Sequence, residues 1–105
     1  MTGLPDANRP AFNAAAKVLR SFGLEVVNPA ELDISHPVPD LWVSYMSRDI
    51  RYLSECNLGI ALPGWKGSKG AVIEIALLRA LGRQVLQYPS IEPIPDDEAP
   101  EIILP

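Results

Sequence analysis

Residues 58–82 constrain the fold more than any other part of this sequence. They begin with the short apolar run LGIALPG, which Pro63 and Gly64 close, as is typical of a buried strand. A glycine-rich loop with two lysines follows, and an apolar helix is expected over residues 70–81, with Gly82 as its stop. A buried strand that leads through a loop into a helix is the repeating unit of α/β domains.

The other segments continue this alternation of helices and strands. A helix is expected over residues 8–22, the short strand LEVVNP at 24–29, a loop with two prolines at 30–39, and a second helix at about 40–56. The segment QVLQYP, at residues 84–89, is the next strand. The order predicts an α/β fold with a small parallel sheet flanked by helices, of the Rossmann or flavodoxin-like kind.

The composition sets limits on the class of protein. A chain of 105 residues suits one small domain, and we expect self-association because such a domain buries little surface alone. No apolar run approaches the roughly 20 residues that span a bilayer, and no signal peptide opens the chain. One cysteine and one histidine argue against a disulfide and a zinc site. We therefore expect a cytoplasmic protein without membrane contact, metal or cofactor.

The charge divides the chain into two parts. The formal net charge is −4, but residues 89–105 hold five of the thirteen acidic residues and no basic one. Residues 1–88 are therefore nearly neutral, and no basic surface for a nucleic-acid polymer is expected. The predicted organisation is a domain at 1–88 followed by an acidic, proline-rich tail at 89–105.

Asp49 occupies an unusual position in the second predicted helix. It follows Tyr45 by four residues and precedes Tyr52 by three, so it lies between aromatic side chains on one face. A carboxylate at the margin of a core is costly unless it has a partner. The simplest interpretation is an acid paired with Arg48, with Arg51 or with a backbone N–H; the alternative is a functional acid.

Glu74 is the acid within the apolar helix that follows the glycine-rich loop. Compensation of the helix dipole would explain an acid in a first turn, but it does not explain the loop. Ser68, Gly70 and the unpaired N–H groups of the helix start form a ready anion site, to which Lys66 and Lys69 add positive charge. The glycines fit neither a Walker motif nor G-x-G-x-x-G.

Three segments together resemble the nucleoside 2-deoxyribosyltransferase-like superfamily, and in particular its small, often phage-borne members. They are MTGLPDANRPAFNAAAKVLRSFGLEVVNPAEL, YMSRDIRYLSECNLGIALPGW and SKGAVIEIALLRALG, within residues 1–87. The resemblance implies that Glu74 is the nucleophile on the anomeric carbon and that Asp49 protonates or positions the leaving base. Ser68 and Gly70 match the serine and glycine with which the nucleotide N-hydrolase branch binds a 5′-phosphate.

The residue types suit this chemistry. Cleavage of an N-glycosidic bond passes through an oxocarbenium-like state, which a carboxylate stabilises or captures while a second acid protonates the leaving group. Gly67 and Lys69 belong to the expected phosphate loop, and Tyr45 and Trp65 are candidate stacking faces for the base, although core packing explains aromatic residues equally well. A homodimer is expected, as in the relatives.

Three functions follow as hypotheses. The first is hydrolysis of a (deoxy)nucleoside 5′-monophosphate to free base, with a nucleoside deoxyribosyltransferase as its close variant. The second is a nucleotide-binding module without turnover, and the third is an interaction protein that acts through its acidic tail.

The sequence departs from the family at two places. The family usually opens with a central strand and a glycine-rich turn before the segment that here begins at Met1, so we expect either that the start codon is placed too late or that another segment takes the place of this strand. One hypothesis is that EIILP, residues 101–105, fills its place; another is a degraded homologue without activity. Asn57 stands where many relatives have an acid.

Overall fold

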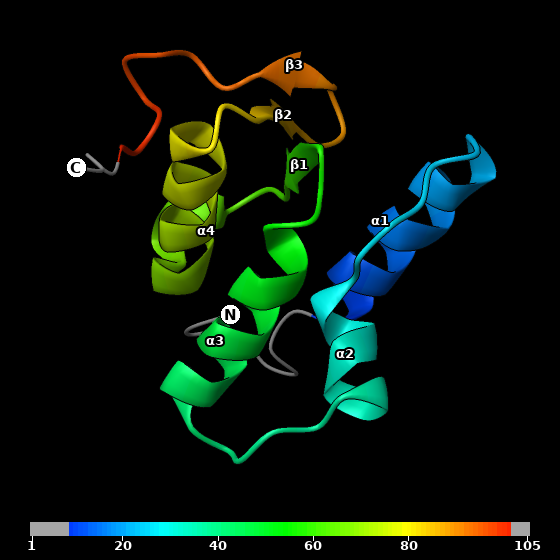
Figure 1. The fold of residues 1–105 in the computed structure, drawn as a ribbon. Coiled ribbons are helices and arrows are strands. Elements are labelled where there is room, and N and C mark those ends of the chain that lie inside the picture. Colours follow the sequence, from blue (N-terminus) through cyan, green and yellow to red (C-terminus); the bar gives the residue numbers. More distant parts are fainter. Residues whose placement is uncertain (1–8, 102–105) are drawn as a thin grey trace.

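The fold is that of a computed structural model, which describes residues 9–101. Within these residues, four α-helices, one short 3-10 helix and three short strands follow one another, and Figure 1 shows their arrangement. In chain order they are α1 (Arg9–Ser21), α2 (Pro29–Ser35), α3 (Trp42–Leu53), β1 (Leu58–Ala61), η2 (Trp65–Gly67), α4 (Lys69–Ala80), β2 (Gln84–Gln87) and β3 (Glu92–Pro93). The prediction of an α/β fold is confirmed.

The sheet is mixed, with the strand order β1-β2-β3. β1 and β2 are parallel, as predicted, and Leu58 is in register with Gln84 and Ala61 with Gln87. β3 pairs with β2 in the antiparallel direction, which corrects the expectation of a purely parallel sheet. β3 is only two residues long, and three prolines lie in or near it. The sequence there therefore shows no alternating pattern that would predict a strand.

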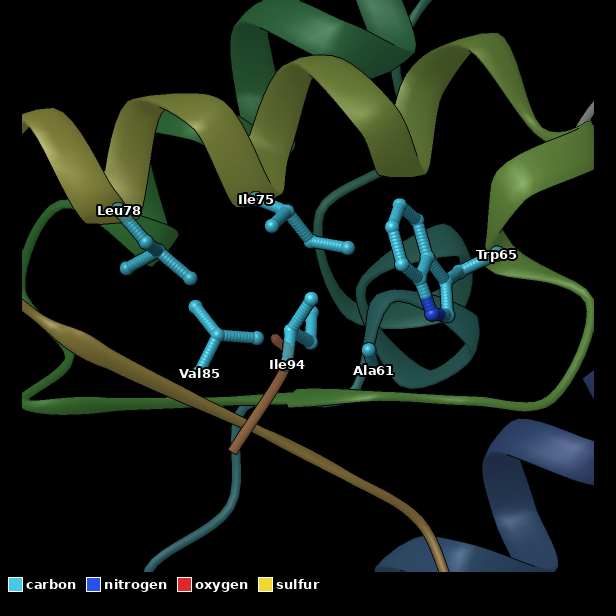
Figure 2. Close-up of a cluster of buried hydrophobic side chains, with 6 residues drawn as sticks. All are labelled: Ala61, Trp65, Ile75, Leu78, Val85 and Ile94. Carbon is cyan, nitrogen blue, oxygen red and sulfur yellow. The ribbon is translucent and has the colours of Figure 1, made fainter. Parts of the chain in front are cut away.

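The core lies between α4 and the sheet. Ala61, Trp65, Ile75, Leu78, Val85 and Ile94 form one buried cluster, in which Figure 2 shows Leu78 near one end and Trp65 near the other. Gly59 lets the Leu78 side chain pack directly against the backbone of β1, because a Cβ on Gly59 would overlap that side chain. Ile94 comes from the segment after β3, so part of the predicted tail belongs to the core.

Residues 24–35 contradict two predictions. LEVVNP forms no strand, and the predicted loop contains the helix α2. Asn28 explains the difference, because its side chain accepts a hydrogen bond from the N–H of Ala30 at 3.0 Å and Pro29 takes the first turn of the helix. An Asn-Pro pair that we interpreted as the end of a strand is in fact the start of a helix.

Two helix pairs pack beside this core in the described part of the chain. α1 packs on α2, where Arg20 and Glu31 form an ion pair at 2.6 Å, and α3 packs on α4. Figure 1 shows the α1–α2 pair beside the β1 edge of the sheet. The predicted cap at Asn8 and the expected strand pairing of Ile102–Pro105 lie outside the described residues, and Glu101 belongs to no strand.

None of the helices between residues 9 and 101 is both long and apolar enough to cross a bilayer.

Candidate functional site

The helix α4 carries Glu74 into the site. Ser68 caps this helix, since its hydroxyl accepts a hydrogen bond from the N–H of Ala71 at 3.2 Å. Glu74 therefore lies in the second turn, and no acidic residue occupies the first turn. The helix dipole acts within the first turn, so dipole compensation does not explain this carboxylate.

The helix α3 carries Asp49, and it packs against α4. The side chains of Asp49 and Glu74 line one pocket of about 120 Å³, together with Ser68 and Trp65. The rest of its wall is mostly apolar and comes from β1, the loop after it, β2 and the helices α1, α2, α3 and α4. Within the described chain, four of the predicted site residues therefore meet at one place.

The other four predicted site residues do not line this pocket. Gly70 is buried inside the start of α4, and Gly67 is exposed in η2. The Tyr45 hydroxyl donates a hydrogen bond to Asp40 at 2.9 Å, and Lys69 lies 4.5 Å from the ring centre of Trp42. The lysine Lys66 is also directed elsewhere, because it pairs with Glu98 of the tail.

Asp49 forms the ion pair that the simplest interpretation of the sequence predicted. Its Oδ1 accepts hydrogen bonds from Nε and Nη2 of Arg48 at 3.0 and 2.9 Å. Burial raises the pKa of Asp49, and the bound guanidinium opposes that rise. Asp49 therefore both forms an ion pair with Arg48 and lines the pocket.

Glu74 has a different electrostatic environment. Among residues 9–101, no basic side chain forms an ion pair with it. Burial, and second the negative charge of Asp49, raise the pKa of Glu74 to about 7. Two carboxylates that face one pocket with unequal partners are a common basis for acid–base chemistry.

The loop after β1 supplies pocket residues that our sequence analysis did not single out. Pro63 and Gly64 line the pocket, and Gly64 turns the chain with a φ of 85°, in the left-handed region that favours glycine. These two residues directly follow a predicted parallel strand, and the ends of such strands are where α/β sheets place ligands, so their position could have predicted a place in the pocket. Phe12 and Pro29 also line the pocket, but nothing in the sequence connects them with residues 49–74.

A second pocket, of about 210 Å³, adjoins the first. The two share Ala61 to Trp65, and Lys66, Gln87 and Tyr88 complete the wall of the second. It therefore lies at the carboxyl ends of β1 and β2, where open α/β sheets place ligands. In the described part of the chain, no group of His, Cys, Asp and Glu side chains has the arrangement of a metal site.

Residues 1–87 match the model of a single protein family, a domain of unknown function designated DUF4406. The chain belongs to the DUF4406 family. The match ends at Gln87, the last residue of β2, so β3 and the tail follow the matched DUF4406 region. Neither the curated proteins nor the solved structures contain a match. The family description states no activity, and the function of this DUF4406 protein has to be argued from its site.

Proposed function

We propose that this protein hydrolyses the N-glycosidic bond of a (deoxy)nucleoside 5′-monophosphate and releases the free base. The observation that carries the proposal is the pair Asp49 and Glu74, which come from two packed helices and line one pocket. The resemblance to the nucleoside 2-deoxyribosyltransferase-like superfamily adds the substrate class. A Rossmann-like sheet, a homodimer and a cytoplasmic location belong to the same proposal.

In the proposed reaction, a Glu74 oxygen attacks C1′ of the sugar. The C1′–N bond breaks, and its electron pair leaves with the base, which takes a proton from Asp49. Water then attacks C1′ of the glycosyl ester, its oxygen joins the sugar, and the proton of the water returns to Asp49. Glu74 leaves as a carboxylate, so the products are free base and (deoxy)ribose 5-phosphate. If a second base replaces water, the reaction is the transfer that we consider as its variant.

The start of α4 supports the 5′-phosphate part of the proposal. Ser68 lines the pocket and caps this helix, and the first backbone N–H groups of a helix attract anions. Gly70 and Gly67 are proposed to let the backbone approach the phosphate closely. The ammonium group of Lys69 lies at the Trp42 ring and not in the pocket wall. Lys69 is therefore proposed to contribute positive charge near the loop without contacting the phosphate.

Trp65 is proposed to contact the base, and Tyr45 to act indirectly through Arg48. Trp65 lines both pockets, so its indole ring is available to a base bound in either of them. Tyr45 lies under Arg48, whose guanidinium carbon is 5.4 Å from the ring centre, and contributes through that contact.

One observation favours a second candidate function, a nucleotide-binding module without turnover. The charge of Asp49 is already paired with Arg48, and a paired acid is a poorer proton donor. Such a module would bind the nucleotide and return it intact. The two candidates therefore differ in the fate of the ligand rather than in its affinity.

Mass spectrometry of a nucleotide mixture incubated with the protein tests the proposal. We expect loss of one or more nucleoside 5′-monophosphates and the matched appearance of base and sugar phosphate. Mixtures of nucleosides and of triphosphates serve as controls for the phosphate requirement. A nucleotide that binds but is recovered intact would support the binding module, and the absence of any consumed nucleotide would overturn the enzymatic proposal.

A further inference from the structure

Arg48 is the centre of a buried group of charges behind the pocket. Its Nη2 donates hydrogen bonds to Oδ1 of Asp33 at 2.6 Å and to Oδ1 of Asp49 at 2.9 Å. The side chains of Arg48, Asp33 and Asp49 are 4%, 8% and 6% exposed. Arg9 contacts the other oxygen of Asp33 at 3.1 Å, from the exposed side of α1. One buried cation is therefore shared between two carboxylates.

Arg48 contacts only one of the two pocket acids, Asp49. Asp49 accepts two guanidinium hydrogen bonds through its Oδ1, whereas Glu74 forms no ion pair among the described residues. Among residues 9–101, the charged groups of this network are Arg9 on α1, Asp33 on α2, and Arg48 on α3, and β1 contributes no charged residue. When both pocket acids are ionised, this group holds three negative and two positive charges. One proton on the pair removes the excess.

We propose that Arg48 and Asp33 are positioning residues that decide which of the two pocket acids carries this proton. Arg48 keeps Asp49 ionised and fixes its orientation, so the proton in the ligand-free site goes to Glu74. Asp33 competes for Arg48 and so limits how strongly Asp49 is stabilised as an anion. Substrate must then draw the proton from Glu74 to Asp49 before the proposed attack, which makes this group a determinant of the working pH.

A purely structural role is the alternative for these residues, because the Asp33–Arg48 contact also joins α2 to α3. The two roles predict different responses to Asp33→Asn. Asparagine keeps the size of the side chain and an oxygen acceptor for Arg48, but it removes the negative charge. A structural contact would lose little beyond stability, whereas an electrostatic one would shift the titration of Asp49.

The test is a pH titration of the side-chain carboxyl ¹³C signals of Asp49 and Glu74, recorded without substrate. In the unaltered protein we expect Glu74 to titrate at higher pH than Asp49. In Arg48→Gln we expect the order to invert, with Asp49 moving up by about one pH unit or more and Glu74 moving down. In Asp33→Asn we expect Asp49 to move down. Arg20→Gln, which removes the remote α1–α2 ion pair, is the matched control and should leave both signals in place.

An unchanged titration order in a folded Arg48→Gln protein would overturn the inference. If Arg48→Gln does not fold, Asp33→Asn decides, and an Asp49 titration equal to that of the Arg20→Gln control would overturn it. The inference rests on the proposed function only for the catalytic roles of Asp49 and Glu74. Because the titration needs no substrate, a protein that releases no base would refute the proposed function and leave this test unaffected.

Discussion

Asp49 and Glu74 line the same pocket although they lie on different helices and 25 positions apart in the chain. Asp49 has a guanidinium partner, and Glu74 depends on burial and on its neighbour's charge. This asymmetry distinguishes the pair from two surface acids, and it gives each carboxylate a separate measurable behaviour.

The first prediction concerns the stability cost of Glu74. Its pKa is raised to about 7 from an ordinary value of 4.5, so between these pH values the folded protein binds a proton that the unfolded chain has lost. Stability therefore falls as the pH rises through this window, by on the order of 3 kcal/mol. Glu74→Gln should remove that loss and be more stable than the unaltered protein at pH 8.

Urea unfolding at pH 5 and pH 8 measures this effect. Glu55→Gln is the matched control, because Glu55 is exposed just after α3. An equal pH dependence in the Glu74→Gln and unaltered proteins would show that Glu74 is not the buried acid described above.

The second prediction concerns the pH dependence of base release. The pair must hold one proton for the leaving base, and the ligand-free site loses that proton as the pH rises past the pKa of Glu74, so kcat/KM should fall as the pH increases through about 7. Initial rates between pH 5 and pH 9 give the profile. A rate that instead rises through this range would show that the site reacts without a proton on this pair, and it would contradict Asp49 as the proton donor.

The third prediction separates the two roles of Ser68. Ser68→Asp keeps a good helix cap, so its free energy of unfolding should stay within about 0.5 kcal/mol of the unaltered protein. Its negative charge should repel a 5′-phosphate and raise KM for the monophosphate by roughly tenfold or more. Ser68→Ala should instead cost about 1 kcal/mol of stability through loss of the cap.

Steady-state kinetics and urea unfolding of both Ser68 variants provide the comparison. If Ser68→Asp leaves KM unchanged, the phosphate does not bind at the start of α4.

The fourth prediction concerns the segment that follows β2. Ile94 is buried in the core cluster, so Ile94→Ala should reduce the free energy of unfolding by about 2–5 kcal/mol. Ile91→Ala is the control, since Ile91 is half exposed, and it should cost less than about 1 kcal/mol. Similar losses in the two variants would argue against a structural role for this segment.

Local signals in the sequence predicted α4, β1 and β2, because each has a clear apolar pattern and a glycine or proline at its end. The same signals failed for residues 24–35. Leu24 to Val27 favour a strand by residue type, but a strand also needs a neighbour to pair with. The described sheet offers them no pairing, and Asn28 starts a helix instead.

The candidate site was predictable in part for the same physical reason. Ser68 and Glu74 share one loop and helix, so their proximity follows from the local structure. The contact between Asp33 and Arg48 depends on where α2 lies, and α2 was not expected at all. Lys66 and Lys69 were expected near the anion site, but Glu98 and Trp42 hold their ammonium groups elsewhere.

Base release by the unaltered protein, Glu74→Gln and Glu55→Gln, followed side by side on a consumed nucleoside 5′-monophosphate, tests the central claim most directly. We predict release by the unaltered protein and by Glu55→Gln at similar rates, and a rate at least about a hundredfold lower for Glu74→Gln. Glu74→Gln that releases base as fast as the unaltered protein would contradict the assignment of Glu74 and, with it, the proposed chemistry of this pocket.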